Sequence, residues 1–187
     1  MTRGRTQNQE EEASTRVRPQ RLFFALWPDP PATAALAAAA AELAALAGGK
    51  AVPAGKIHLT LAFLGDVGDD RLDAIRSAAS RLRCKAFDLA LDQAGSFRAA
   101  RVAWVGSRKP ARGLIELHAA LAGELAACGF PPDERPYTPH ATMARKISRQ
   151  VERRAVAPIE WRARELSLVR SELGKGSYDT LAGWSLG

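Results

Sequence analysis

Residues 56–65 read "KIHLTLAFLG", an apolar run of strand length that carries a histidine and a threonine among aliphatic side chains. Because side chains alternate between the two faces of a β-strand, His58 and Thr60 project from the same face. The opposite face has the character of a core strand and consists of Ile57, Leu59, Leu61 and Phe63. The stretch therefore predicts a strand that packs its aliphatic side on the core and holds two polar groups at the wall of a cleft.

A second run, "PHATMAR" at residues 139–145, repeats the histidine-x-threonine tripeptide. The chain has three histidines, and two of them begin such a tripeptide. By the same alternation His140 and Thr142 share a face, whereas Arg145 falls on the opposite one. Arg145 joins the histidine face only if the strand ends, twists or bulges near Ala144.

Two imidazoles and two hydroxyls in one cleft favour general acid-base chemistry on a phosphoryl group. A histidine has an unperturbed pKa near 6.5, so at neutral pH one ring can accept a proton while the other donates one. Threonine hydroxyls can donate hydrogen bonds to phosphoryl oxygens, and an arginine can stabilise the charge that develops in the transition state. A single His-x-Thr strand is more often a structural pair, so the argument depends on the repetition.

The order of expected elements favours an α+β fold over a doubly wound parallel sheet. Apolar runs between turn signals predict strands, and leucines or alanines at helical spacing predict helices. We expect Asp69 or Asp70 to cap the second helix. The expected strands cover 21–27, 56–65, 86–95, 101–106, 139–145, 159–173 and 178–184, and the expected helices cover 32–47, 71–83 and 114–125.

The composition of the 187 residues is typical of a soluble globular protein, with 47% hydrophobic and 25% charged residues. Residues 1–20 contain almost no large apolar side chains and predict a disordered tail, which leaves 21–187 as the folded domain. The net charge of +7 would attract polyanions such as nucleic acid. The alanine-rich stretch 33–47 is short and contains Glu42, so we expect no membrane span and a cytoplasmic location. Two cysteines, Cys84 and Cys128, form no metal-site or disulfide pattern.

Five segments, in this order, resemble the two-histidine phosphoesterase superfamily, and within it the RNA 2',3'-cyclic phosphodiesterases, historically called 2'-5' RNA ligases. The resemblance covers residues 21–187. The segments that carry it are "RLFFALWP", "HLTLAFLG", "RVAWVG", "PHATMAR" and "LSLVRSELGKGSYDTL".

This resemblance implies a single catalytic domain of two similar lobes, with mainly antiparallel sheets around a pseudo-twofold axis and an active-site groove between them. His58 matches the proton donor that protonates the departing 3' oxygen, and His140 matches the proton acceptor that activates water. Thr60, Thr142 and Arg145 match the phosphate-binding residues. The implied substrate is RNA or an oligonucleotide with a 2',3'-cyclic phosphate end, the implied product is a 2'-phosphomonoester, and neither a metal nor another cofactor is required. We expect a monomer.

Two alternative functions remain open at this stage. The same site could run the reverse reaction and join a cyclic end to a 5'-hydroxyl as a 2'-5' linkage. Alternatively, the chain could be a basic RNA-end binding module whose histidines recognise a terminal phosphate without catalysis.

Several further residues are candidates for RNA contact. His118 has no threonine partner and is interpreted as structural, and Lys175 in the expected turn "GKGS" could touch RNA phosphate. Aromatic rings can stack on bases, although we expect Phe63 in particular to lie in the core, on the aliphatic side of its strand. The basic clusters are Arg98, Arg101, Arg108, Lys109 and Arg112, then Arg145, Lys146, Arg149, Arg153 and Arg154, and the aromatic candidates are Phe23, Phe63, Trp104 and Tyr137.

Overall fold

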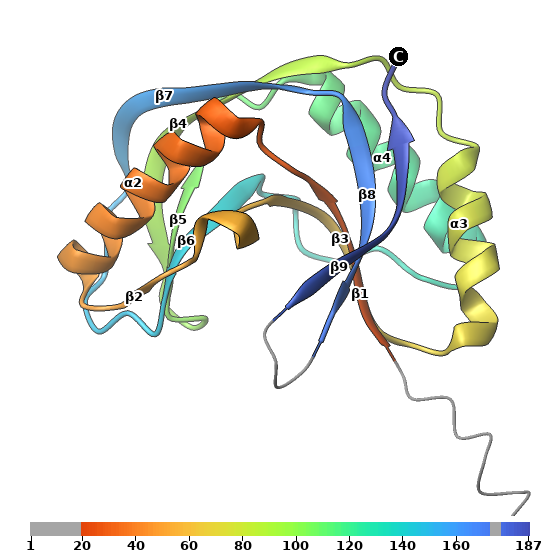
Figure 1. Ribbon diagram of the computed structural model, residues 1–187, viewed down its shortest axis with the longest axis horizontal. Helices are drawn as coiled ribbons and strands as arrows, with labels where there is room; N and C mark the ends of the chain where they lie inside the picture. Colours follow the sequence, from red (N-terminus) through yellow and green to blue (C-terminus); the bar gives the residue numbers. More distant parts are fainter. Residues whose placement is uncertain (1–19, 173–176) are drawn as a thin grey trace, which may run out of the picture.

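The computed structural model describes residues 20–172 and 177–187, which form an α+β domain built on one large antiparallel sheet. Most of the predicted tail, and Lys175, lie outside the described residues. Gln20, which we assigned to the tail, begins the first strand. Figure 1 shows the strongly curved sheet with helices at both ends of its arch.

In chain order the elements are β1 Gln20–Leu26, α2 Pro30–Ala47, β2 Lys50–Ala51, η2 Ala54–Lys56, β3 Leu59–Val67, η3 Asp69–Arg71, α3 Leu72–Ser80, β4 Phe87–Phe97, β5 Val102–Gly106, α4 Arg112–Ala127, β6 His140–Arg145, β7 Arg154–Ala163, β8 Glu165–Ser171 and β9 Tyr178–Ser185.

The sheet consists of two halves that meet between the two histidine strands. Its order is β7-β4-β5-β6-β3-β1-β8-β9, and the short β2 pairs with β6 outside this path. One half is β3-β1-β8-β9 and the other is β6-β5-β4-β7, so each half places its histidine strand at the junction. The strands β3 and β6 are joined through a single residue pair, Leu59 with Ala141.

Each half of the sheet is covered by a helix that follows a strand of the other half. Helix α2 follows β1 but packs against β6, and α4 follows β5 but contacts β3. The units β1-α2-β3 and β5-α4-β6 are therefore equivalent, because the helix of each unit packs on the half of the sheet that does not contain that unit. Figure 1 shows α2 at one end of the arch and α3 with α4 at the other. This exchange ties the halves together and confirms the predicted two-lobed α+β class.

Local sequence signals explain where α2 begins and ends. The Asp29 side chain accepts a hydrogen bond of 3.0 Å from the backbone N–H of Ala32, and prolines occupy the first helical positions. Gly48 ends the helix with a φ of 64°, in the left-handed region that glycine adopts without steric cost. By length and apolar composition alone α2 could cross a membrane, but here it packs against β6 and buries one face, which includes Leu36, Ala40 and Leu43.

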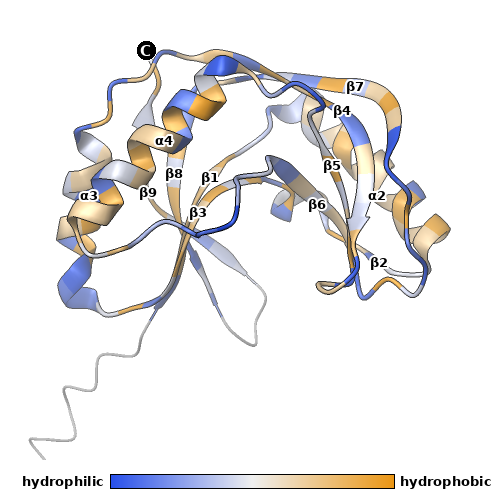
Figure 2. Ribbon diagram, turned by 180° about the vertical axis from the view of Figure 1, so that it is seen from behind, coloured by the Kyte–Doolittle hydropathy of each residue, from blue (hydrophilic) through white to orange (hydrophobic). Residues whose placement is uncertain are grey.

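One continuous core lies between the sheet and the helices, as the hydrophobic residues in Figure 2 indicate. The leucines that repeat at helical spacing along α4 are all buried: Leu114, Leu117, Leu121 and Leu125. A second, smaller cluster lies on the other face of β1. It consists of Phe23, Ala25 and Val169, with Trp27 and Tyr178 packed against it.

Three predictions about elements were wrong. The expected strand 159–173 is two strands that separate at Arg164, because β7 pairs with β4 in one half whereas β8 pairs with β1 in the other. The expected helix 71–83 is shorter, and no aspartate side chain caps it, since Asp69–Arg71 form a 3-10 turn and Arg71 occupies the capping position.

Phe63 was predicted to lie in the core, but it is 76% exposed. The register of β3 against β1 explains why: Phe24 pairs with Ala62 and Ala25 pairs with Thr60, which leaves Leu61 as an extra residue. Such a bulge reverses the alternation of side chains beyond it. Phe63 therefore points to the same side as Thr60.

Candidate active site

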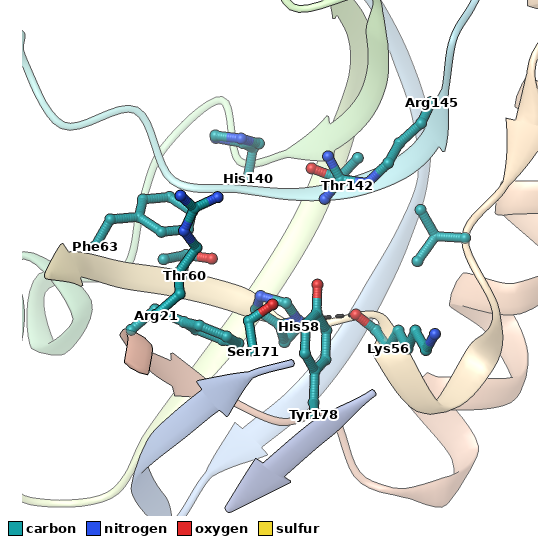
Figure 3. A pocket seen from close by; sticks show the side chains of 12 residues that line it. Arg21, Lys56, His58, Thr60, Phe63, His140, Thr142, Arg145, Ser171 and Tyr178 are labelled. Atoms are coloured by element: carbon teal, nitrogen blue, oxygen red, sulfur yellow. Dashed lines mark hydrogen bonds between the residues drawn. The ribbon is translucent and has the colours of Figure 1, made fainter. Parts of the chain in front are cut away.

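A pocket at the junction of the two halves brings both tripeptides together. All five residues predicted for the site line it: Thr60 lies in β3, His58 directly before β3, and His140, Thr142 and Arg145 in β6. Figure 3 shows these side chains converging on one space. Among the described residues its lining consists of Arg21, Phe23, Val52, Lys56, His58, Thr60, Phe63, His140, Thr142, Arg145, Ser171 and Tyr178.

The pairing of Leu59 with Ala141 sets the arrangement at the centre of the pocket. In an antiparallel pair the residues that flank such a contact oppose each other crosswise. His58 therefore lies near Thr142, and Thr60 lies near His140, as Figure 3 shows. Each imidazole thus lies across from the threonine of the other tripeptide, and all four side chains line the same pocket.

Both histidines are held in the same tautomer by equivalent hydrogen bonds. Nδ1 of His58 donates to the carbonyl oxygen of Lys56 at 2.8 Å, and Nδ1 of His140 donates to that of Thr138, also at 2.8 Å. A carbonyl oxygen can only accept, so the proton must be on Nδ1 when the ring is neutral. This leaves Nε2 of each ring free to exchange a proton with a ligand.

Burial is the main reason that the pKa of each histidine lies below its usual value. It lowers the pKa of His58 to about 4, and it lowers the pKa of His140 as well. The positive charge of Arg145 lowers both further, because it disfavours a second cation nearby. Both rings are therefore neutral at neutral pH while the pocket is empty, and a bound anion would raise both pKa values.

The two imidazoles have different aromatic surroundings. The ring of His58 stacks on Phe23 at 4.8 Å and also contacts Trp27 and Tyr178. His140 meets Phe97 edge to face at 4.9 Å and Trp104 at 6.5 Å. The aromatic cluster on the pocket side of β1 thus fixes the orientation of His58 and excludes water from it.

A bulge brings Arg145 into the pocket. In the pairing of β5 with β6, Ala103 opposes Ala144 and Trp104 opposes Thr142, so Met143 is an extra residue. The alternation reverses there, and Arg145 joins the face of His140 and Thr142. From the sequence, Arg145 could join the histidine face only if the strand had such an irregularity near Ala144.

The charge of the pocket is positive. Arg21, Lys56 and Arg145 line it, and no acidic residue lines it in the part of the chain that the structure describes. The sequence analysis did not identify Arg21, Lys56, Ser171 or Tyr178. Arg21 could have been found, because it lies two positions before Phe23 on a predicted strand and so shares its face.

The other candidates lie outside the pocket or serve the fold. Arg108 pairs with Asp92 at 2.8 Å, and Arg149 donates to carbonyl oxygens near the end of α2. His118 stacks on Tyr137 with ring centroids 3.8 Å apart. Trp104 is buried, and Tyr137 is partly buried.

Tyr137 restrains the backbone at Thr60, because its hydroxyl donates a hydrogen bond of 3.1 Å to the carbonyl oxygen of that residue. We expect Tyr137→Phe to lower the free energy of unfolding by about 0.5–1.5 kcal/mol, the usual net value of a neutral hydrogen bond. We also expect a few-fold loss of kcat/KM, because Thr60 loses one of its positional restraints. Denaturant unfolding and steady-state kinetics check both effects. A loss as large as that of Thr60→Ala would contradict this indirect role.

Comparison with known proteins agrees with this geometry. Residues 28–175 match the family model described as the 2'-5' RNA ligase superfamily. The RNA 2',3'-cyclic phosphodiesterase of Escherichia coli strain K12 is 38% identical over 144 residues, which cover 74% of this chain and 80% of that protein. The crystal structure of E. coli LigT in apo form superposes with a TM-score of 0.79 at 34% identity, covering 90% of this chain and 98% of that one. LigT complexed with 3'-AMP gives a TM-score of 0.76 at 36% identity, with the same coverage.

The chain belongs to the 2'-5' RNA ligase superfamily. It is an enzyme, a hydrolase of the cyclic phosphodiesterase type.

Proposed function

We propose that this enzyme hydrolyses a terminal 2',3'-cyclic phosphate of RNA or an oligonucleotide to a 2'-phosphomonoester by general acid-base catalysis. The observation that supports this most strongly is that two imidazoles and two threonine hydroxyls line one pocket, with Nδ1 of each ring bonded to a backbone carbonyl oxygen, so that Nε2 is the ring atom left to exchange a proton. The names of the relatives support the same reaction.

In the proposed step Nε2 of His140 takes a proton from water as the water oxygen bonds to phosphorus. The bond from phosphorus to the 3' oxygen breaks, and Nε2 of protonated His58 gives its proton to that oxygen. One bond to phosphorus forms and one breaks, and the proton gained by His140 balances the proton lost by His58. Exchange with solvent then restores the starting state.

The remaining groups act on the phosphoryl oxygens. The hydroxyls of Thr60 and Thr142 donate to the two non-bridging oxygens, and Arg145 stabilises the charge that grows on them. The same anion raises the pKa of His58 from its low value in the empty pocket, so the substrate itself promotes protonation of the acid.

The metal requirement is a separate part of the proposal. Among residues 20–172 and 177–187, no three His, Cys, Asp or Glu side chains gather as a metal site would require. We propose that the reaction uses neither metal nor cofactor. We further expect the enzyme to act as a cytoplasmic monomer without a membrane partner.

The direct test is to incubate a short RNA with a 2',3'-cyclic phosphate end in EDTA and to identify the hydroxyl that retains the phosphate. We expect a 2'-phosphate. Retardation of the RNA without any change in its end would instead indicate an RNA-end binding module. Activity that requires added metal would overturn the proposed mechanism.

The second candidate function is ligation of a cyclic end to a 5'-hydroxyl as a 2'-5' linkage, which the name of the family suggests. The same two proton transfers permit it, with a hydroxyl in place of water. Because water is far more concentrated than any RNA end, we expect hydrolysis to dominate. Adding a 5'-hydroxyl oligonucleotide to the assay and measuring the joined product gives the ratio of the two reactions.

A further inference from the structure

Lys56 is a cation of the pocket to which the proposed reaction gives no role. It lines the pocket from the last position of η2, and its side chain is partly buried. Its carbonyl oxygen holds the ring of His58, but its ammonium group makes no ion pair and no hydrogen bond with any residue in the described part of the chain. A cation without a partner in the protein is available to an anionic group of the ligand.

The positive charge of the pocket exceeds what a cyclic phosphate can neutralise. Three cations line it, but Nε of Arg21 lies 3.3 Å from a carboxylate oxygen of Asp66, which offsets its charge. Neither Lys56 nor Arg145 has such a partner among residues 20–172 and 177–187. A 2',3'-cyclic phosphate carries one negative charge, and in the proposed reaction Arg145 stabilises it. The charge of Lys56 therefore remains for a second anion.

Lys50 extends the positive charge beyond this end of the pocket. In β2 it pairs with Arg145 of β6, and opposed residues of antiparallel strands point to the same side of the sheet. It also lies two positions before Val52, which lines the pocket, so alternation along the strand gives it the same direction. Lys50 is exposed. Figure 3 shows Lys56 and Arg145 at the end of the pocket away from Arg21.

We propose that Lys56, with Lys50 beyond it, binds the phosphodiester on the 5' side of the terminal nucleotide, so that the enzyme selects the end of an RNA chain over a free nucleoside 2',3'-cyclic phosphate. This inference rests on the proposed function. The 5' phosphate is the next anion along the chain from the cyclic phosphate, with one ribose between them. A lysine recognises a phosphate by charge and reads no base, so the selection is for chain over monomer and is independent of sequence.

The test compares two substrates that differ by one phosphodiester: adenosine 2',3'-cyclic phosphate, and the same compound with a methyl phosphodiester on its 5' oxygen. The second substrate carries the charge of an RNA linkage without a second base. The quantity measured is the ratio of their kcat/KM values, because a variant that only lowers activity changes both values alike.

Five variants locate the contact. Lys56→Met and Lys50→Met each remove a charge and keep much of the length of the side chain, whereas Lys56→Arg keeps the charge. Arg21→Met tests the opposite end of the pocket. Lys109→Met is the matched control, since it removes an exposed cation outside the pocket.

In the wild type we expect kcat/KM to be about tenfold higher for the substrate with the phosphodiester, the effect of one hydrogen bond to a charged group. Lys56→Met should lower this ratio to about twofold, and Lys50→Met, which removes an exposed lysine, should lower it to about fivefold. Lys56→Arg, Arg21→Met and Lys109→Met should keep the ratio. For the substrate with the phosphodiester, the slope of log kcat/KM against log salt concentration should be shallower by about 0.7 in Lys56→Met.

Three results would overturn the inference. Equal kcat/KM for the two substrates in the wild type would mean that the 5' phosphate is not recognised. An unchanged ratio in Lys56→Met would remove the lysine from the contact. Loss of the ratio in Arg21→Met alone would place the phosphate at the other end of the pocket. Should Lys56→Met fail to fold, the exposed Lys50→Met carries the same test.

Calorimetry separates this inference from the proposed function. The probes are adenosine 2'-monophosphate and its derivative with a methyl phosphodiester on the 5' oxygen, whose binding does not depend on turnover. If the wild type hydrolysed neither substrate, the proposed reaction would fail, but Lys56 would still have to give the derivative about tenfold tighter binding, and Lys56→Met would have to lose most of that gain. Equal binding of both probes by the wild type would overturn the inference even in an active enzyme.

Discussion

Replacing His140 with Ala is expected to slow hydrolysis of a 2',3'-cyclic phosphate on the order of 10²-fold or more, and so is replacing His58, because each ring transfers a proton in the proposed step. The measurement is kcat and kcat/KM for an RNA with a cyclic end, in EDTA. His118→Ala is the matched control, since this third histidine lies on α4, outside the pocket. We expect its rate to stay within about threefold of wild type.

The pH profiles of the two variants distinguish their roles. The wild type needs one protonated and one neutral ring, so its profile is bell-shaped. Without the acid His58, the reaction needs only a neutral His140, and the fall in rate at alkaline pH should disappear. Without the base His140, the fall at acidic pH should disappear. If the two variants had the opposite profiles, the assignments would have to be exchanged, and wild-type rates in either variant would exclude a role in proton transfer.

Most of this site could be predicted from the sequence because it depends on short-range geometry. The alternation of side chains along a strand is enough to place His58 beside Thr60 and His140 beside Thr142. That the two pairs meet could be inferred from their repetition and from the family resemblance but not from local geometry, since the contact between β3 and β6 is a single residue pair between distant segments. The resemblance to a known family supplied the expectation of two lobes.

The error at Phe63 and the condition placed on Arg145 have a common physical origin. Strict alternation puts both side chains on the face away from the histidines, but each strand contains a bulge directly after its threonine. A bulge depends on how a strand pairs with its partner, β1 or β5, so the sequence of the bulged strand alone does not predict it. The similarity between "HLTLAF" and "HATMAR" could nevertheless have predicted it. Arg145 already required a bulge to reach the site, and the same bulge in the first run would have brought Phe63 to the pocket.

The prediction of one undivided strand over 159–173 was wrong for a similar reason. Its apolar character is continuous, but β7 pairs with β4 in one half of the sheet and β8 with β1 in the other. Which partner a strand takes is a property of the tertiary structure. The change of partner at Arg164 therefore leaves no clear signal in the hydrophobic pattern.

Arg145→Met is expected to lower kcat about 10²- to 10³-fold, the usual effect of removing one group that stabilises transition-state charge. Methionine keeps much of the length of the side chain but not its charge. Arg145→Lys keeps the positive charge but not the planar guanidinium group, so its kcat should lie between those of the wild type and Arg145→Met. Lys109→Met, which removes an exposed cation outside the pocket, is the control and should leave kcat unchanged.

The pH dependence of the same variants shows whether Arg145 acts through its charge. Because the pKa of His58 is about 4 and that of His140 is also lowered, the optimum of kcat/KM, which reports the free enzyme, should lie below pH 6.5. Removing the arginine charge raises both pKa values, so the profile of Arg145→Met should move toward higher pH, although burial keeps it below the ordinary histidine value. Arg145→Lys should keep the wild-type profile. A slow Arg145→Met enzyme with an unmoved profile would mean that the residue maintains the shape of the pocket and that its charge does not reach the two imidazoles.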